Sequence, residues 1–341
     1  MLLLSRQAKL PSLLCCASSL LSPTGKSLVS SFAWKSSTRS TRLGYSRTMA
    51  AVASDDLLGR TVVSVPDAIS LHKASSPNVK FIDGSWFLMN RNGYEEYLSG
   101  PRIEGAQFFD IDDIATPSHL PHMMPPKQLF ASAMDAMGIS NTDHIIVYGS
   151  KDCMFVHRAW FQIRNMGHGK DYCHLLDGSV ADWQEQGGPI EEGEPSTPIV
   201  NAKDLDVEKP TKYVAKDAQN IVNLEEMKDL VAKDPNDVDA IWIDARSEDR
   251  FYGRVEEPRP GMRLGHMPGA KNLFFLNLLD TENVNKLKPK EELQKIIADA
   301  GIDLSTSKRI IASCGSGATA CTVAAALDLC GTPPEQCYIY A

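Results

Sequence analysis

Short apolar runs alternate with amphipathic stretches along most of this chain. The runs at 80–84 and 144–149 have the length and the β-branched content of buried strands. The stretches at 127–137 and 157–166 have the apolar spacing of helices, a further helix should begin at Asp67, and a further strand should span 107–112. Strands that alternate with helices form a parallel sheet covered by helices, so the pattern predicts an α/β fold.

The same order of elements occurs twice. The matching segments, first copy before second, are 79–85 with 240–246, 105–109 with 269–274, and 144–149 with 309–314. Constant order and offsets of 161 to 165 predict a tandem duplicated domain rather than chance similarity between strands. We expect domains at 57–188 and 213–341, joined by a linker at 189–212 that is rich in proline and acidic residues.

Composition excludes several classes of protein. The net charge of −8 argues against nucleic acid or an anionic membrane as the main partner. No apolar run approaches the roughly 20 residues of a membrane span. The 8 cysteines form no C-x-x-C pair and no zinc-ligand spacing, so we expect reduced thiols and no metal. We also expect a monomer.

The first 53 residues differ from the rest of the chain. They contain no Asp or Glu and carry scattered Arg, Lys and Ser, which is typical of an organellar transit peptide. A mitochondrial location is the first interpretation and a chloroplast the second, with a secretory signal or a disordered tail as alternatives. A second start at Met49 would give a cytosolic form.

One cysteine lies at a predicted strand-to-helix turn. Cys314 follows the apolar run 309–312 and precedes the helical run 320–329. Glycine lets such a turn point successive N–H groups to one place, at the positive end of a helix dipole. This cradle would lower the pKa of a thiol, and the thiolate is the nucleophile. We predict a catalytic thiolate, with a buried packing cysteine as the alternative. The predicted cradle consists of Gly315, Ser316, Gly317, Ala318, Thr319 and Ala320.

Two phosphate-binding loops share this physics, and the sequence excludes both. A Walker loop needs a Lys, and a cysteine-dependent phosphatase loop needs a closing Arg, whereas this loop closes with Thr319-Ala320. An uncharged loop favours a small group such as a persulfide. Because Gly149 stands in the first copy where the second has Cys314, only the second copy is expected to be catalytic.

The chain resembles the two-domain rhodanese superfamily, specifically the 3-mercaptopyruvate sulfurtransferases, from about residue 57 to 341. The segment 314–321, Cys-Gly-Ser-Gly-Ala-Thr-Ala-Cys, is close to the C-G-S-G-V-T-A-C loop of that family. The segments 244–246, 265–270, 109–112 and 120–123 carry further likeness. Thiosulfate-preferring members place Arg and Lys directly after the cysteine, so Gly315 and Ser316 imply mercaptopyruvate as the sulfur donor.

The resemblance implies a ping-pong sulfur transfer without a metal or an organic cofactor. Cys314 would take sulfur from 3-mercaptopyruvate as a persulfide, release pyruvate, and pass the sulfur to a thiol, thioredoxin or cyanide. The alternatives are a thiosulfate:cyanide sulfurtransferase and a non-catalytic persulfide carrier. Cys321 is either a partner in a regulatory disulfide with Cys314 or a packing residue.

Site residues also follow from the resemblance. Arg250 and Arg259 match the two substrate arginines of the family, the alternative being a solvated loop whose arginines pair with Glu256 or Glu257. The catalytic relay of the family matches Ser316, His122 and Asp112. The spacing from Asp112 to His122 is shorter than the family pattern, so His119 and Asp110 are alternatives, as are a capping Asp and a surface His.

One departure concerns the end of the second domain. Family members follow the last strand with an Asp-Gly-Ser-x-x-x-Trp helix, which the first copy shows at 177–183. The second copy stops at Tyr338-Ile339-Tyr340-Ala341, without the residues of this helix. A sheet face without its helix would cost several kcal/mol at about 25 cal/mol per Å². We expect a second domain that lacks this helix and is less stable and less active for it, or a shortened sequence.

Overall fold

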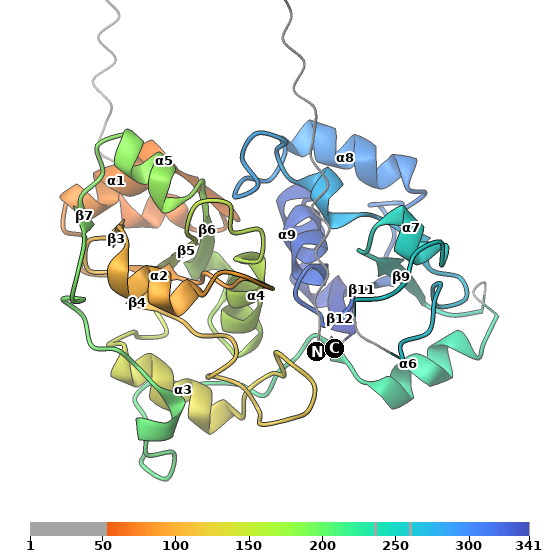
Figure 1. Ribbon diagram of the computed structural model, residues 1–341, viewed down its shortest axis with the longest axis horizontal. Helices are drawn as coiled ribbons and strands as arrows, with labels where there is room; N and C mark the ends of the chain where they lie inside the picture. Colours follow the sequence, from red (N-terminus) through yellow and green to blue (C-terminus); the bar gives the residue numbers. More distant parts are fainter. Residues whose placement is uncertain (1–52, 235–236, 259–260, 341) are drawn as a thin grey trace, which may run out of the picture. The chain divides into compact units, whose positions relative to one another are not determined.

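The computed structural model describes residues 53–234, 237–258 and 261–340 (Figure 1). The predicted transit peptide lies outside these ranges apart from Ala53, and so does Arg259. No helix within them has both the length and the apolar character needed to cross a membrane.

The chain forms two five-stranded parallel sheets that share one strand order. The first half of the molecule comprises β1 to β7, with sheet order β1-β6-β5-β2-β4, and the second half comprises β8 to β12, with order β8-β12-β11-β9-β10. The first half contains β1 (Val62–Ser64), α1 (Val65–Lys73), β2 (Val79–Asp83), α2 (Gly93–Ser99), β3 (Arg102–Ile103), β4 (Gln107–Phe108), α3 (Lys127–Ala136), β5 (His144–Tyr148), α4 (His157–Asn165), β6 (Cys173–Asp177), α5 (Val180–Glu185) and β7 (Ile190–Glu191). The second half contains β8 (Ile221–Val222), α6 (Leu224–Val231), β9 (Ala240–Asp244), α7 (Glu248–Phe251), β10 (Lys271–Asn272), α8 (Lys290–Asp299), β11 (Arg309–Ser313), α9 (Ala320–Cys330) and β12 (Cys337–Tyr340).

The strand registers confirm the duplication. Asp83 of β2 lies opposite Tyr148 of β5, and Asp244 of β9 lies opposite Ser313 of β11. Both pairs are the last of their ladders, so the residue that follows β5 or β11 leaves the sheet at an equivalent point. The α/β prediction with two tandem domains is therefore confirmed.

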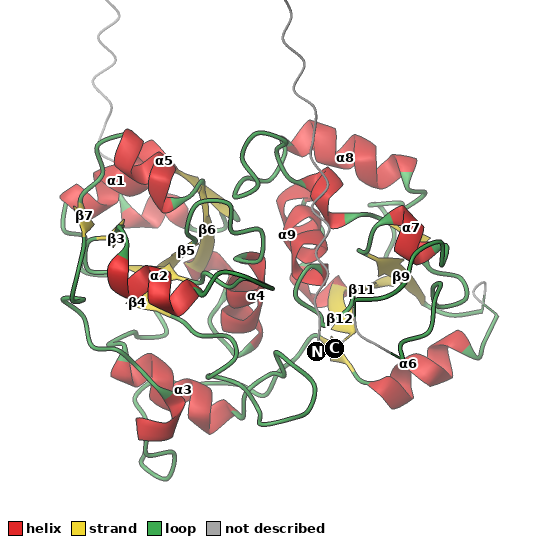
Figure 2. Cartoon of the chain, in the orientation of Figure 1, coloured by secondary structure: helices red, strands yellow, loops and turns green. Residues whose placement is uncertain are grey.

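Helices cover the faces of both sheets (Figure 2). Successive residues of β5 point to opposite faces, so Ile145 and Val147 join one apolar cluster and Ile146 and Tyr148 another. Every residue of β5 is buried. A parallel strand that helices cover on both faces has no solvent-facing side, so its sequence is a continuous apolar run.

The two halves pack together through α4 and α9, which contact each other side by side (Figure 1). One apolar cluster contains residues of both helices. Beside it, Arg164 of α4 forms two parallel hydrogen bonds of 3.0 Å with the Asp328 carboxylate of α9, and Thr61 donates to the same group at 2.7 Å. This ion pair is largely buried, with side chains 8% and 15% exposed, and so joins the halves with defined geometry.

Three element predictions need correction. The first helix begins at Val65 rather than Asp67, because the Ser64 hydroxyl accepts from the Asp67 N–H and caps it there. The strand expected at 107–112 ends at Phe108, because the Asp110 carboxylate accepts two backbone N–H groups and turns the chain. The predicted linker begins with β7, which pairs antiparallel with β3, so its start belongs to the first half.

The packing beside α1 in the first half differs from the packing beside α6 in the second half. In the first half, Trp183 of α5 is fully buried and packs edge-on against Phe81. Trp242 takes the place of Phe81 in the second half. Beside α6 is an apolar groove of about 410 Å³, lined by Leu224, Met227, Lys228, Val231, Ala232, Met267 and Tyr340.

Candidate active site

Cys314 lies directly after β11, at the carboxyl edge of the second sheet. This strand runs between β9 and β12, and the loop that follows leads into α9. Gly317 has φ of 77°, a left-handed conformation that favours glycine. Cys314 is half-buried, while Ala318 and Ala320, further along the chain, are buried. The strand–turn–helix prediction is confirmed. Hydrogen bonds from the backbone N–H groups of the loop to the Cys314 sulfur stay a prediction.

Arg250 of α7 lies beside this loop. Its Nη2 atom is 3.4 Å from the position that a Cβ atom on Gly315 would take. Glu257 accepts from Arg250 Nη2 at 2.5 Å and from Nε at 3.2 and 3.3 Å. The Glu257 side chain is only 3% exposed, and its hydrogen bond with Arg250 contributes most to a lowered pKa. A buried carboxylate thus holds Arg250 against the loop of Cys314.

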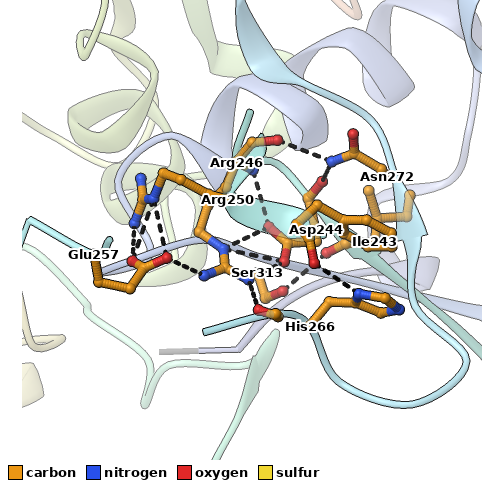
Figure 3. A network of polar contacts seen from close by, with 10 residues as sticks. Ile243, Asp244, Arg246, Arg250, Glu257, His266, Asn272 and Ser313 are labelled. Atoms are coloured by element: carbon orange, nitrogen blue, oxygen red, sulfur yellow. Dashed lines mark hydrogen bonds and ion pairs between the residues drawn. The ribbon is translucent and has the colours of Figure 1, made fainter. Parts of the chain in front are cut away.

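Glu257 also binds a second arginine (Figure 3). Arg246 donates from Nη1 to Glu257 at 2.8 Å and from Nη2 to Asp244 at 2.6 Å. Its hydrogen bond with Asp244 is the main cause of its raised pKa, and negative charge on Cys314 adds to the effect. Arg246 is therefore bound within the protein by two carboxylates. Arg254 is exposed and pairs with Glu248 and Asp249.

The two sequence hypotheses for Arg250 are both realised in part. It pairs with Glu257, as the alternative required, and it lies against the loop of Cys314, while its role in substrate binding stays a prediction. Sequence reasoning did not find that Glu257 joins Arg246 to Arg250, because nothing in the sequence separates it from the neighbouring Glu256. Arg259 lies outside the described residues.

His122 and Asp112 form a pair in the first half. His122 Nδ1 and Asp112 Oδ1 are 2.6 Å apart, and the Trp86 indole N–H donates to the other carboxylate oxygen at 2.7 Å. The Trp86 ring also packs edge-on against His122, with 4.6 Å between ring centres. Burial acts to raise the pKa of Asp112, but His122, Trp86 and the charge of Arg158 outweigh it and lower that pKa. The pair is therefore a carboxylate that orients an imidazole.

The alternatives for this pair have other places. Asp110 caps a turn by accepting from the N–H groups of Asp112 and Asp113, and His119 is exposed. His122 is 4% exposed, so it is not a surface histidine. Within the described part of the chain, Ser316 and His122 share no hydrogen bond, so the complete relay stays a prediction. The roles of Trp86 and Arg158 have no signal in the sequence.

The equivalent loop of the first half is filled by the second half. Gly149 occupies the position of Cys314, and the side chain of Asn285 lies beside it. Asn285 accepts from the Asp152 N–H at 2.9 Å and donates to the Ser150 carbonyl at 2.9 Å. Burial raises the pKa of the nearby Cys153 thiol to about 11. An occupied loop with a protonated thiol agrees with the expected asymmetry between the two copies.

The comparisons with known proteins agree with this arrangement. The family model described as Rhodanese-like domain matches residues 205–341. The thiosulfate/3-mercaptopyruvate sulfurtransferase 1, mitochondrial, of Arabidopsis thaliana is 35% identical, over 77% of this chain and 70% of its own length. The 3-mercaptopyruvate sulfurtransferase of Rattus norvegicus is 33% identical, over 82% of this chain and 90% of its own length.

A solved structure extends the likeness to three dimensions. The crystal structure of the 3-mercaptopyruvate sulfotransferase SseA from Escherichia coli is 30% identical, with a TM-score of 0.65. The match covers 82% of this chain and 97% of that one. Sequence and fold thus agree, and the chain belongs to the rhodanese superfamily, in its family of 3-mercaptopyruvate/thiosulfate sulfurtransferases.

Proposed function

We propose that this enzyme takes sulfur from 3-mercaptopyruvate on Cys314 and passes it to a thiol, thioredoxin or cyanide. In the first step the Cys314 thiolate attacks the donor sulfur. The carbon–sulfur bond breaks, its electron pair stays on carbon as the pyruvate enolate, and the enolate takes a proton to give pyruvate. In the second step the acceptor attacks the outer sulfur, and Cys314 leaves as a thiolate. The covalent intermediate divides one difficult transfer into two easier ones.

One observation carries the choice of donor. The loop after Cys314 has no charged side chain of its own, and Arg250 lies against it at Gly315. Arg246 and Arg250 face Asp244 and Glu257, so their charges are matched by carboxylates. Among the residues that the structure describes, the charges beside the loop are thus balanced, so Arg259 is the one cation left to supply surplus charge to the substrate, an arrangement that suits a monocarboxylate such as 3-mercaptopyruvate better than the thiosulfate dianion. A planar guanidinium can bind a carboxylate through two hydrogen bonds. We assign Arg250 and Arg259 as the residues that bind the substrate carboxylate.

The roles of the pair in the first half follow from its geometry. We assign His122 as the proton donor to the enolate, Asp112 as the carboxylate that orients it, and Ser316 as the hydroxyl that polarises the donor carbonyl. The N–H groups of residues 315–320 stabilise the thiolate and the persulfide. Substitution of Cys314 by Ser removes the attacking sulfur in this account.

A comparison of donors tests the proposal. Pyruvate release from 3-mercaptopyruvate should exceed thiocyanate formation from thiosulfate and cyanide, each measured as kcat/KM with the same enzyme. The reverse order would favour a thiosulfate:cyanide sulfurtransferase. A persulfide that forms without turnover in the presence of a small thiol would favour a persulfide carrier.

We further propose a mitochondrial location. The acid-free segment 1–53 and the mitochondrial relative from Arabidopsis thaliana support it. A fluorescent fusion of the full chain should enter mitochondria, and one that begins at Met49 should stay in the cytosol. Accumulation of the full-length fusion in chloroplasts would replace this assignment.

A further inference from the structure

Arg158 is a fully buried cation at the start of α4, in the half of the molecule that lacks the nucleophile. Within the described ranges its Nε atom has no hydrogen-bond partner. Burial of a guanidinium costs free energy unless its other N–H groups form hydrogen bonds. The contacts of its two Nη atoms therefore have to offset this cost.

Those two atoms contact both sides of the candidate active site. Nη2 donates to the backbone carbonyl of His122 and lies 3.6 Å from Met124 Sδ. Nη1 lies 3.9 Å from the sulfur of Cys321 in the first turn of α9. The Cys321 thiol in turn donates to the Gly317 carbonyl at 3.1 Å, within the loop of Cys314. One side chain thus bridges the His122 segment and the catalytic loop.

His122 needs such support because its backbone is strained. Its φ is 58°, a left-handed conformation that a residue with a Cβ atom adopts at a cost. The hydrogen bond from Arg158 fixes its carbonyl, while Asp112 and Trp86 fix its ring. The positive charge of Arg158 also favours the ionised form of Asp112. The backbone of His122 and its ring are therefore held by different residues.

We propose that Arg158 is a positioning residue for the sulfur transfer, which holds His122 and its partner Asp112 in place beside the loop of Cys314. This inference rests on the proposed function. Formation of the persulfide requires a proton for the enolate, which a correctly placed His122 supplies. Discharge of the persulfide to a thiolate releases Cys314 as a thiolate and requires no proton from His122. Loss of Arg158 should therefore slow the first step more than the second.

Single-turnover kinetics of Arg158→Met and Arg158→Lys test this difference. Arg158→Met should slow pyruvate release by roughly 10- to 100-fold, a part of what positioned acid–base catalysis contributes. Discharge of a preformed persulfide to a small thiol should change less than about 3-fold. Arg158→Lys should recover part of the loss, because an ammonium can still donate to the His122 carbonyl. In combination with His122→Asn, Arg158→Met should cause no additional loss, because both act through one side chain.

Arg164→Met is the matched control, since Arg164 is the other guanidinium on α4 that reaches α9. It should lower the stability of the protein and leave the ratio of the two steps unchanged. Equal slowing of both steps by Arg158→Met, or additive losses with His122→Asn, would overturn the inference.

A measurement without turnover separates this inference from the proposed function. The proton between His122 Nδ1 and Asp112 should give a downfield NMR resonance that Arg158→Met shifts or removes and Arg164→Met retains. An unchanged resonance in Arg158→Met would refute the positioning role even if the enzyme is active. Absence of pyruvate release from the unmodified enzyme would refute the proposed function, and the resonance would still decide on Arg158.

Discussion

The Nη2 atom of Arg250 lies 3.4 Å from the point where a Cβ atom on Gly315 would stand. The residue after Cys314 therefore cannot gain a side chain without contact to a guanidinium that Glu257 holds in place. The cysteine loop and the cation beside it thus fit each other, and this fit should decide which sulfur donor the enzyme accepts.

Replacement of Arg250 by Lys should weaken binding of 3-mercaptopyruvate. Lysine keeps the charge but loses the planar guanidinium, which binds Glu257 through Nε and Nη2 and has further N–H groups for a substrate carboxylate. Hydrogen bonds to charged groups contribute about 1.5–3 kcal/mol, so KM should rise roughly 10- to 100-fold with a smaller change in kcat. Arg254→Lys is the control, because that side chain is 55% exposed and pairs with Glu248 and Asp249. An unchanged KM in Arg250→Lys would remove this residue from the substrate site.

Replacement of Gly315-Ser316 by Arg-Lys should shift the donor preference toward thiosulfate. Two added cations would surround Cys314 with the surplus charge that a dianion requires. We expect the ratio of kcat/KM for thiosulfate to that for 3-mercaptopyruvate to rise by at least about tenfold, or about 1.4 kcal/mol. Gly315-Ser316→Gln-Gln adds side chains of similar size without charge. A similar shift in that control would mean that volume, and not charge, selects the donor.

The fold was largely predictable because its signals are local and repeated. Residues 144–149 and 309–314 differ in sequence but have the same apolar character and the same place in their copies. Such runs predict central strands, and the constant offsets predict two domains. The weak points were the short elements, where one side chain decides: Asp110 ends β4 by accepting two N–H groups.

The candidate site was predictable only in part, because its contacts join distant segments. The position of Cys314 follows from local sequence, since a strand, two glycines and a helix adjoin it. The pair of Asp112 and His122 came from family likeness and is present as a hydrogen bond. Arg158 contacts His122 across 36 positions and Cys321 across 163 positions of sequence, and no local pattern reports such contacts.

The Arg164–Asp328 ion pair should contribute strongly to stability. Asp328→Asn would leave the Arg164 cation without its counter-charge in a site where the two side chains are 8% and 15% exposed. Loss of one partner of a buried pair typically costs about 3–5 kcal/mol, measurable as a lower urea midpoint. The control is Asp299→Asn, which breaks an exposed pair with Lys295 and should cost less than about 1 kcal/mol. Equal effects of the two variants would contradict the role of Asp328 in joining the halves.

Acid should destabilise the protein as pH falls from about 6.5 to about 4. Burial lowers the pKa values of His157, His168 and His174 to about 4. The unfolded chain binds protons at these sites below pH 6.5 before the folded chain does, so folding free energy is lost on acidification. Asp83, Asp110 and Asp177 oppose this, because burial raises their pKa values, that of Asp83 to about 6. His144, whose pKa burial lowers, and Glu257, whose pKa the hydrogen bond from Arg250 lowers, add to the loss, so we expect the net effect to be destabilising.

Urea unfolding at about pH 7.5 and about pH 5 measures this dependence. The midpoint should be lower at the acidic pH, and His168→Gln should reduce the difference between the two values. A midpoint that stays constant or rises on acidification would show that these histidines are not buried as described.

The most direct test of the account is the intact mass of the protein after addition of 3-mercaptopyruvate without an acceptor. We predict a gain of one sulfur atom, mapped to Cys314 by peptide analysis, together with release of one pyruvate. The gain should disappear when a thiol is added, and Cys314→Ser should show neither the gain nor the pyruvate. A protein that releases pyruvate without gaining sulfur, or gains it on another cysteine in Cys314→Ser, would contradict the central claim.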